Sequence, residues 1–174
     1  MKVTLHTGAG KTGTSAIQVA LAALRPQLAK AGIHYPQGFG NTGERADRGE
    51  VSSGNAVAIG WLLDPIERKD GFDRAAILAW LQAAIAEAAG RDLLFSSEMM
   101  QRPDPLEAAD LCRLFAATGH DVHIIYYLRH ALDQSLAAYL QALKRGQIAQ
   151  RSLGTLEAFI DTQARCPYLD ALTP

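Results

Sequence analysis

The sequence predicts an α/β fold in which helices cover both faces of a central parallel sheet. Three observations indicate it. Short apolar segments rich in β-branched residues alternate with longer segments of helical periodicity. A strand pattern at the N-terminus runs through a glycine-rich loop into a helical pattern. Residues 122–128 form a continuous apolar run, which is typical of a strand buried on both faces. We therefore expect residues 1–174 to form one three-layer α/β/α domain with right-handed crossovers.

The first strand is expected over residues 3–5, and a loop containing Lys11 follows it. Thr14 or Ser15 has the side chain to cap the helix after this loop. That helix is expected to continue to Gly32, because glycine commonly ends a helix. Its predicted inward face consists of Ile17, Ala20, Leu21, Leu24 and Leu28.

A second short strand is expected over residues 33–35, ended by Pro36. Residues 37–53 are rich in Gly, Asn, Arg, Asp and Glu and contain few apolar side chains. This composition predicts a loop of functional length. Helices are expected over residues 56–63 and from the cap Asp73 to residue 89.

The third strand is expected over residues 92–96, with Ser97 and Glu98 at its exit. Asp104 followed by Pro105 predicts a helix start, and Gly119 predicts its end. After the apolar strand at 122–128 comes a helix over residues 131–144, and Thr155 caps a last helix. The expected inward residues of the helix at 131–144 are Leu132, Leu136, Leu140 and Leu143.

Composition bounds the class of protein. Apolar residues make up 48% of the chain and charged residues 20%, which is typical of a globular domain. The net charge of -1 argues against nucleic-acid binding and favours a small-molecule ligand. Cys112 and Cys166 stand in no metal or redox spacing, and no apolar run is long enough to span a membrane. We expect a cytoplasmic protein.

The loop around Lys11 has the composition of an anion site. Glycines let the backbone approach a ligand, and the first N–H groups of the following helix favour negative charge. A nucleotide-triphosphate loop needs a glycine five residues before Gly10-Lys11-Thr12, but Leu5 occupies that position. The loop therefore predicts a phosphate-like ligand without matching that motif. The alternative is a plain strand-to-helix turn.

Ligands of open α/β sheets bind beyond the carboxyl ends of the strands. Three polar features stand at such ends: the Lys11 loop, the segment 96–98 that ends in Glu98, and Arg129 after the apolar strand. Arg129 suits a second anion contact, although an ion pair at a helix start is the alternative. For Glu98 the alternative is a capping or salt-bridging acid.

These segments resemble the bacterial sulfotransferase family, which has a P-loop-like fold and transfers a sulfuryl group from 3′-phosphoadenosine 5′-phosphosulfate (PAPS). Its members carry a Lys-Thr-Gly-Thr-Thr/Ser loop, a strand ending in Ser-Ser-Glu, and an apolar strand ending in arginine before a helix with Tyr-x-Gln. The resemblance extends from Lys2 to about Ala171. The matching residues are Lys11-Thr12-Gly13-Thr14-Ser15, Ala16-Ile17-Gln18, Ser96-Ser97-Glu98, Arg129, Tyr139 and Gln141.

The resemblance implies that the 5′-phosphosulfate is held by Lys11 and the loop backbone, and the 3′-phosphate by Arg129. Lys11 would also neutralise the leaving oxygen, and Glu98 would accept the proton of the acceptor hydroxyl. Other candidate bases are His6, His34 and His130. The acceptor would be a carbohydrate, a lipid or a small metabolite, selected by residues 37–53, and the chemistry requires no metal. The full set of donor-binding residues is Gly10, Lys11, Thr12, Gly13, Thr14, Ser15 and Arg129.

Two departures from the family pattern keep other functions open. The family has a serine eight residues after the arginine, where this chain has Ala137. The family also continues with at least one more strand and a loop over the donor, so we expect that a C-terminal portion is lacking. A non-catalytic binding module is thus one alternative. A P-loop nucleotide kinase or NTPase is the other, although no apolar strand here ends in the aspartate it would use for Mg²⁺.

Overall fold

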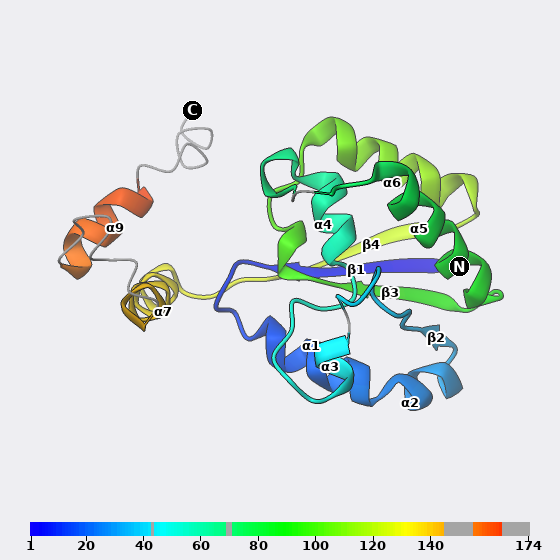
Figure 1. The fold of residues 1–174 in the computed structure, drawn as a ribbon, viewed down its shortest axis with the longest axis horizontal. Helices are drawn as coiled ribbons and strands as arrows, with labels where there is room; N and C mark the ends of the chain where they lie inside the picture. The colour runs from blue at the N-terminus through cyan, green and yellow to red at the C-terminus, as the bar shows by residue number, and fades with distance from the viewer. Residues whose placement is uncertain (43, 69–70, 145–154, 165–174) are drawn as a thin grey trace. The chain divides into compact units, whose positions relative to one another are not determined.

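The computed structural model describes residues 1–42, 44–68, 71–144 and 155–164. Its contacts divide the chain into two compact units. The first consists of Met1–Ala9 and Gly13–Leu128, and the second of Gly10–Thr12 and Arg129–Pro174. The first unit contains the sheet, and the second contains helices α7 and α9 (Figure 1).

The sheet of the first unit has four parallel strands in the order β2-β3-β1-β4. The central strand β1 aligns Val3 with Leu93 on one side and with Val122 on the other. This arrangement confirms an α/β fold with a parallel sheet. The strands are β1 (Lys2–Gly8), β2 (Ile33–His34), β3 (Asp92–Ser96) and β4 (Asp121–Tyr127).

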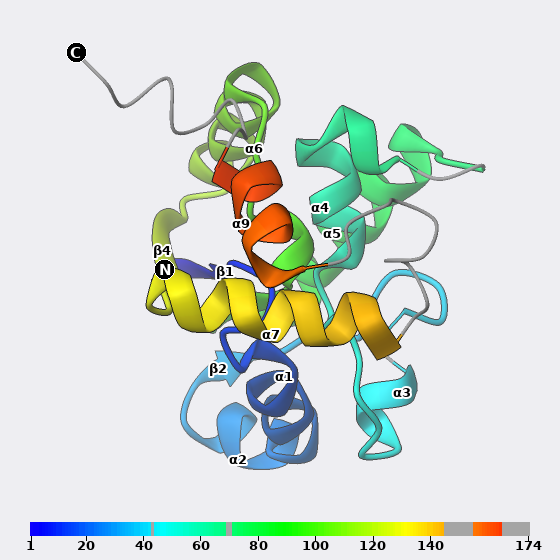
Figure 2. The same ribbon diagram turned by 90° about the vertical axis from the view of Figure 1, so that its left-hand side faces the viewer.

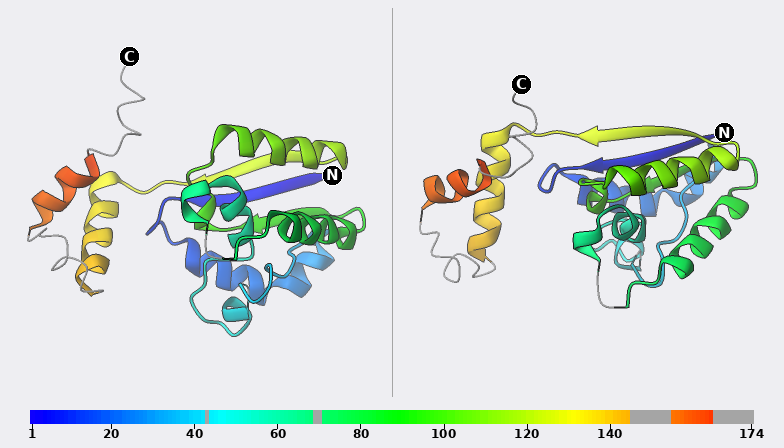
Figure 3. Two further views of the ribbon diagram at one scale, coloured as in Figure 1. Left: turned by 45° about the horizontal axis from the view of Figure 1, so that its top comes forward. Right: turned by 90° about the horizontal axis from the view of Figure 1, so that it is seen from above.

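Helices pack against both faces of this sheet. One face presents Leu5 and Phe95 to a core cluster shared with α4 (Val57–Leu63), α5 (Arg74–Ala88) and α6 (Pro105–Ala117). The other face presents Leu94 to a smaller cluster with α1 (Thr14–Ala23), α2 (Arg25–Lys30) and α3 (Glu44–Asp47). In Figures 1 and 3 these two groups of helices lie on opposite sides of the strands. The alternation of side chains along each strand accounts for the two clusters.

The prediction for the first helix was wrong in two respects. Its N-cap is Gly13 in the left-handed conformation (φ 89°), and neither Thr14 nor Ser15 caps it. The helix also ends early: Leu24 separates α1 from α2, and Pro26 lies in the first turn of α2. Proline lacks the N–H that a continuous helix would need at this position, so the chain starts a new helix instead.

The buried face of α1 also differs from the expected apolar face. Thr14, Gln18 and Ala22 are the buried residues of α1. Leu24, which was expected to point inward, is 46% exposed. Because Leu24 lies at the junction with α2, it cannot continue the helical face that its spacing suggested.

The middle of the chain follows its predictions closely. The described residues of the segment 37–53 are irregular except for the short helix α3, and short 3₁₀ turns η1 (Pro65–Glu67) and η2 (Glu98–Met100) follow α4 and β3. Asp73 caps α5 by accepting a hydrogen bond from the backbone N–H of Ala76. Asp104 caps α6 by accepting from the N–H groups of Leu106 and Glu107. Both predicted caps are confirmed.

The prediction that the strand at 122–128 is buried was wrong. β4 is an edge strand in the part of the chain that the structure describes. Ile124 is 67% exposed and Ile125 47% exposed, so neither face is fully covered. An apolar run of this kind shows that the side chains of a strand are apolar. It does not show that a further strand lies beside it.

The second unit contains α7 (Ala131–Lys144) and α9 (Leu156–Ala164), which pack together (Figure 2). The rings of Tyr139 and Phe159 meet edge to face, with centroids 5.6 Å apart. Thr155 caps α9 by accepting from the N–H of Ala158, as predicted. The inward orientation expected for the leucines of α7 was wrong, because no residue of α7 is buried. Among the described helices, none is long and apolar enough to cross a membrane.

Candidate functional site

Two left-handed residues shape the loop between β1 and α1. Lys11 has a φ of 69° and Gly13 a φ of 89°. Glycine adopts this conformation freely, whereas for a lysine it costs on the order of 1 kcal/mol or more. Such strain in a loop with a single cation is typical of sites where the backbone is held for binding.

The N-terminus of α1 keeps its positive end open. No side chain caps it, and no acidic residue lies in its first turn. The N–H groups of Ala16 and Ile17 donate to the carbonyl of Gly13, at 3.2 and 3.5 Å. The N–H groups of Thr14 and Ser15 stand at the very start of the helix. The helix itself offers them no carbonyl acceptor. This geometry suits an anion.

A polar cluster of the first unit joins the carboxyl ends of β1 and β3 to α1. His6 Nδ1 and Ser96 Oγ are hydrogen-bonded at 2.7 Å, and the N–H of Ser97 donates to the carbonyl of His6 at 3.0 Å. The hydroxyl of Thr14 donates to Glu98 Oε2 at 3.5 Å. Thr14 is buried and Glu98 half-buried. The structure therefore brings two predicted site residues, Thr14 and Glu98, into contact.

The three histidines considered as bases occupy different positions. Burial lowers the pKa of His6, which favours the neutral ring, and the ring packs edge to face on Tyr127 with centroids 4.9 Å apart. His34 pairs with Leu93, at the amino end of β3, so it lies away from the strand exits. Burial and then the charge of Arg91 lower its pKa. His130 is exposed in the second unit.

Asn55 holds the end of β3 and was not singled out from the sequence. This residue is 2% exposed. Its Oδ1 accepts from the N–H of Ser96 at 2.8 Å, and its Nδ2 donates to the carbonyls of Pro36 (3.0 Å) and Leu94 (3.3 Å). The chain just after the irregular segment 37–53 is thereby tied to β3, the strand that leads to Glu98. The run Ser52-Ser53-Gly54-Asn55 is a turn signal that could have drawn attention to it.

Gly54 allows this close approach. A Cβ at this position would lie 2.0 Å from the carbonyl oxygen of Ser96, and its φ is +84°. Both the space and the conformation require glycine. The N–H of Ala56 then donates to the same carbonyl at 3.3 Å.

In the second unit, Lys11 and Arg129 come together. Arg129 Nη1 donates to the carbonyl oxygen of Lys11 at 3.1 Å. Lys11 also lines an open hollow of about 470 Å³ with Ala137, Gln141, Lys144 and Leu140. Two of these lining residues are cations and none is acidic, so the hollow attracts anions. Ala137, the position where the sulfotransferase resemblance implies a serine, faces this same hollow.

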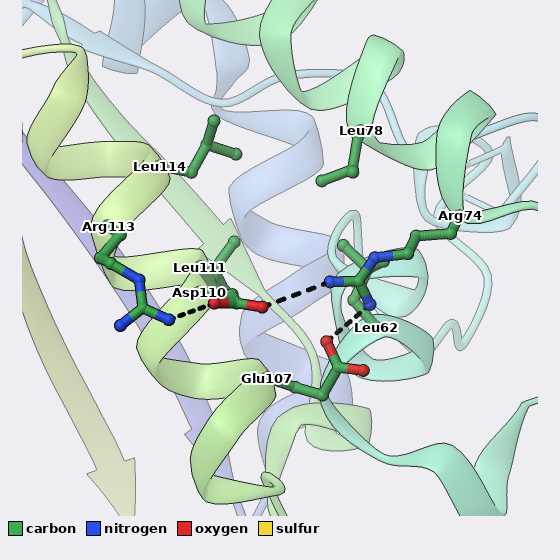
Figure 4. A pocket seen from close by; sticks show the side chains of 8 residues that line it. All are labelled: Leu62, Arg74, Leu78, Glu107, Asp110, Leu111, Arg113 and Leu114. Carbon is green, nitrogen blue, oxygen red and sulfur yellow. Dashed lines mark hydrogen bonds and ion pairs between the residues drawn. The ribbon is translucent and has the colours of Figure 1, made fainter.

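Elsewhere in the first unit, an ion-pair network joins Arg68 and α5 to α6. It borders a pocket of about 360 Å³ (Figure 4). Glu107 accepts from Arg74 at 2.6 Å and from Arg68 at 2.8 Å, and Asp110 pairs with Arg74 and Arg113. Because both carboxylates are paired with arginines, we interpret the network as a support for α6. No group of three potential metal ligands occurs within the described ranges.

Comparison with known protein families, with curated proteins and with solved structures returned no match to this chain.

Proposed function

We propose that this chain binds PAPS in a P-loop-like α/β/α fold and transfers its sulfuryl group to a hydroxyl acceptor. The observation that carries the proposal is the hydrogen bond from Arg129 to the carbonyl of Lys11. It joins the guanidinium of Arg129 to the backbone of Lys11, the two residues that the sulfotransferase resemblance assigns to the two ends of one bisphosphorylated ligand. Each unit also has a feature of its own that suits an anion: the open N-terminus of α1 in the first unit and the hollow with Lys144 in the second.

The donor-binding roles follow the chemistry of each group. The Lys11 ammonium and the N–H groups of Thr14 and Ser15 suit the 5′-phosphosulfate, together with the backbone of Gly10, Thr12 and Gly13. The guanidinium of Arg129 suits the 3′-phosphate, because its planar fork can donate two parallel hydrogen bonds. Ala137 supplies no hydroxyl, so Arg129 would carry more of the 3′-phosphate recognition.

PAPS supplies the sulfuryl group, and the residues of the chain supply positioning and charge. The Glu98 carboxylate takes the proton of the acceptor hydroxyl while the acceptor oxygen forms its bond to sulfur. The bond between sulfur and the 5′-phosphate oxygen breaks, and its electron pair stays on that oxygen. Lys11 offsets the charge that develops there. The hydrogen bond from Thr14 helps to orient the Glu98 carboxylate.

Calorimetric titration with 3′-phosphoadenosine 5′-phosphate (PAP) and with ATP–Mg²⁺ tests the proposal. We expect the wild type to bind PAP in preference to ATP–Mg²⁺. Lys11→Ala should weaken PAP binding about 10- to 100-fold, since a charge-assisted hydrogen bond contributes about 1.5–3 kcal/mol. Lys30→Ala, which removes an exposed lysine of α2, should leave the affinity unchanged.

Two outcomes would overturn the proposal. Preference for ATP–Mg²⁺ would favour a nucleotide kinase or NTPase. Binding of neither ligand would favour a non-catalytic module, the alternative to which Ala137 already points.

A further inference from the structure

The hollow beside Lys11 in the second unit contains a second lysine, Lys144. Four residues of α7 line this hollow together with Lys11: Ala137, Leu140, Gln141 and Lys144. Residues three or four positions apart are neighbours on a helix surface, so these four form one face of α7. The hollow has a volume of about 470 Å³, which is within the range of small-molecule sites. Lys144 is therefore placed to contact whatever Lys11 binds.

Neither ammonium group in this hollow has a carboxylate partner. Within the described part of the chain, the side chains of Lys11 and Lys144 form no ion pair. No acidic residue belongs to the lining. Two like charges that share a hollow repel each other, and an anion that contacts both offsets this repulsion. The charges of the hollow thus favour a ligand group that is negatively charged.

A lysine in the last turn of a helix can also serve the helix itself, because the last carbonyls carry partial negative charge. Side chains of an α-helix, however, lean toward its N-terminus. The side chain of Lys144 therefore leans back toward the turn that contains Leu140 and Gln141, with which it lines the hollow. This direction leads away from the last carbonyls and toward the space shared with Lys11.

We propose that Lys144 is a further contact for the 5′-phosphosulfate, beside Lys11. The inference rests on the proposed function, because it takes PAPS as the ligand. Arg129, assigned to the 3′-phosphate, is not among the residues that line the hollow, and its guanidinium donates to the carbonyl of Lys11. Ala137, which offers the 3′-phosphate no hydroxyl, lies about 10 Å before Lys144 along the helix axis. Lys144 thus shares its space with the ammonium of Lys11 and belongs to the 5′ end of the ligand.

This assignment gives Lys144 a different effect on binding from that of Arg129. AMP carries a 5′-phosphate alone, whereas PAP also carries the 3′-phosphate. In both ligands the 5′-phosphate stands in for the 5′-phosphosulfate of PAPS. Lys144→Ala should therefore weaken PAP and AMP by the same factor, about five- to tenfold, because solvent screens part of a charge-assisted contact at an exposed lysine. Arg129→Ala should weaken PAP alone. Calorimetric titration with each ligand measures the affinities.

Two control variants separate a direct contact from a general effect of charge. Lys30→Ala removes an exposed lysine of α2 in the first unit and should leave both affinities unchanged. Lys144→Ala combined with Leu143→Lys keeps the net charge and moves the ammonium about 100° around α7. Leu143 is 46% exposed, so a lysine is tolerated there. This double variant should bind as weakly as Lys144→Ala, and circular dichroism confirms that each variant folds.

Each outcome bears on the inference separately from the proposed function. Unchanged affinity of Lys144→Ala for both ligands would overturn the inference and leave the proposed function intact. A loss of PAP affinity alone would assign Lys144 to the 3′-phosphate and would also overturn it. Restored binding in the double variant would show that net charge, not contact, is responsible, and the inference would fail. A wild type that does not bind PAP would overturn the proposed function and this inference together.

Discussion

Replacing Asn55 with alanine should destabilise the first unit strongly. The change removes three hydrogen bonds from a residue that is 2% exposed. Each such bond contributes about 1 kcal/mol net, and the stranded N–H of Ser96 adds a desolvation cost of about 1–3 kcal/mol. Because the bond to Leu94 is long at 3.3 Å, we expect a total loss of about 3–4 kcal/mol. That is a large part of the 5–15 kcal/mol typical of a folded domain.

Urea unfolding followed by circular dichroism measures this loss. With a slope of about 1–3 kcal/mol per molar urea, the midpoint should fall by roughly 1–4 M. Asn41→Ala, an exposed position in the same segment, should change stability by less than about 0.5 kcal/mol. Asn55→Asp keeps the acceptor for Ser96 but turns a buried carboxylate oxygen toward the carbonyls of Pro36 and Leu94, so it should destabilise at least as much as Asn55→Ala. A loss under 1 kcal/mol for Asn55→Ala would refute the anchoring role of this side chain.

Three further changes test other parts of the account. Gly54→Ala should lower the free energy of unfolding by more than about 2 kcal/mol, because the new Cβ would collide with the Ser96 carbonyl. Urea unfolding measures this loss. Gly40 also has a positive φ (+57°) but has open space around it, so Gly40→Ala should cost clearly less. Burial raises the pKa of Tyr35 from 10.0 to about 12, although the positive charge of Arg25 opposes this shift. The neutral phenol therefore contributes about 3 kcal/mol to the free energy of unfolding below pH 10, and this contribution is lost as the pH rises to 12. Tyr35→Phe should remove this alkaline loss, and an unchanged pH profile would contradict the assignment. Glu98→Gln should lower the turnover of PAPS at least about 100-fold, while its affinity for PAP stays within threefold of the wild-type value. If the variant turned PAPS over at the wild-type rate, Glu98 would be excluded as the base.

Local signals in the sequence predicted local structure well. Asp73 and Asp104 cap helices because their short carboxylates reach N–H groups two or three residues ahead, an interaction within one turn. The parallel sheet followed from the alternation of strands and helices. Thr14 and Glu98 came together because both stand at strand exits of one sheet edge.

The errors have specific physical causes. The apolar spacing of the first helix was given more weight than Pro26, although proline's missing N–H decides where a helix can continue. The apolar character of β4 could not show that the strand has one neighbour in the described sheet. The spacing of the leucines in α7 predicted a helix correctly but could not identify what covers its apolar face.

The anchoring of β3 by Asn55 was beyond sequence reasoning for a different reason. The hydrogen bond to Ser96 joins residues 41 positions apart, and no local pattern encodes such a pairing. The same holds for Arg129 and the carbonyl of Lys11, which are 118 positions apart. The sequence predicted both residues as anion contacts, and the bond between the Arg129 side chain and the Lys11 backbone emerged only from the fold.

The role of Arg129 in binding a 3′-phosphate is the central claim, and one comparison of affinities tests it most directly. Calorimetry should show that the wild type binds PAP at least about tenfold tighter than AMP, which lacks the 3′-phosphate. Arg129→Ala should abolish this preference while leaving AMP affinity unchanged, and Arg113→Ala, at a 72% exposed arginine of α6, should preserve it. Equal affinity of the wild type for PAP and AMP, or an undiminished preference in Arg129→Ala, would contradict the account.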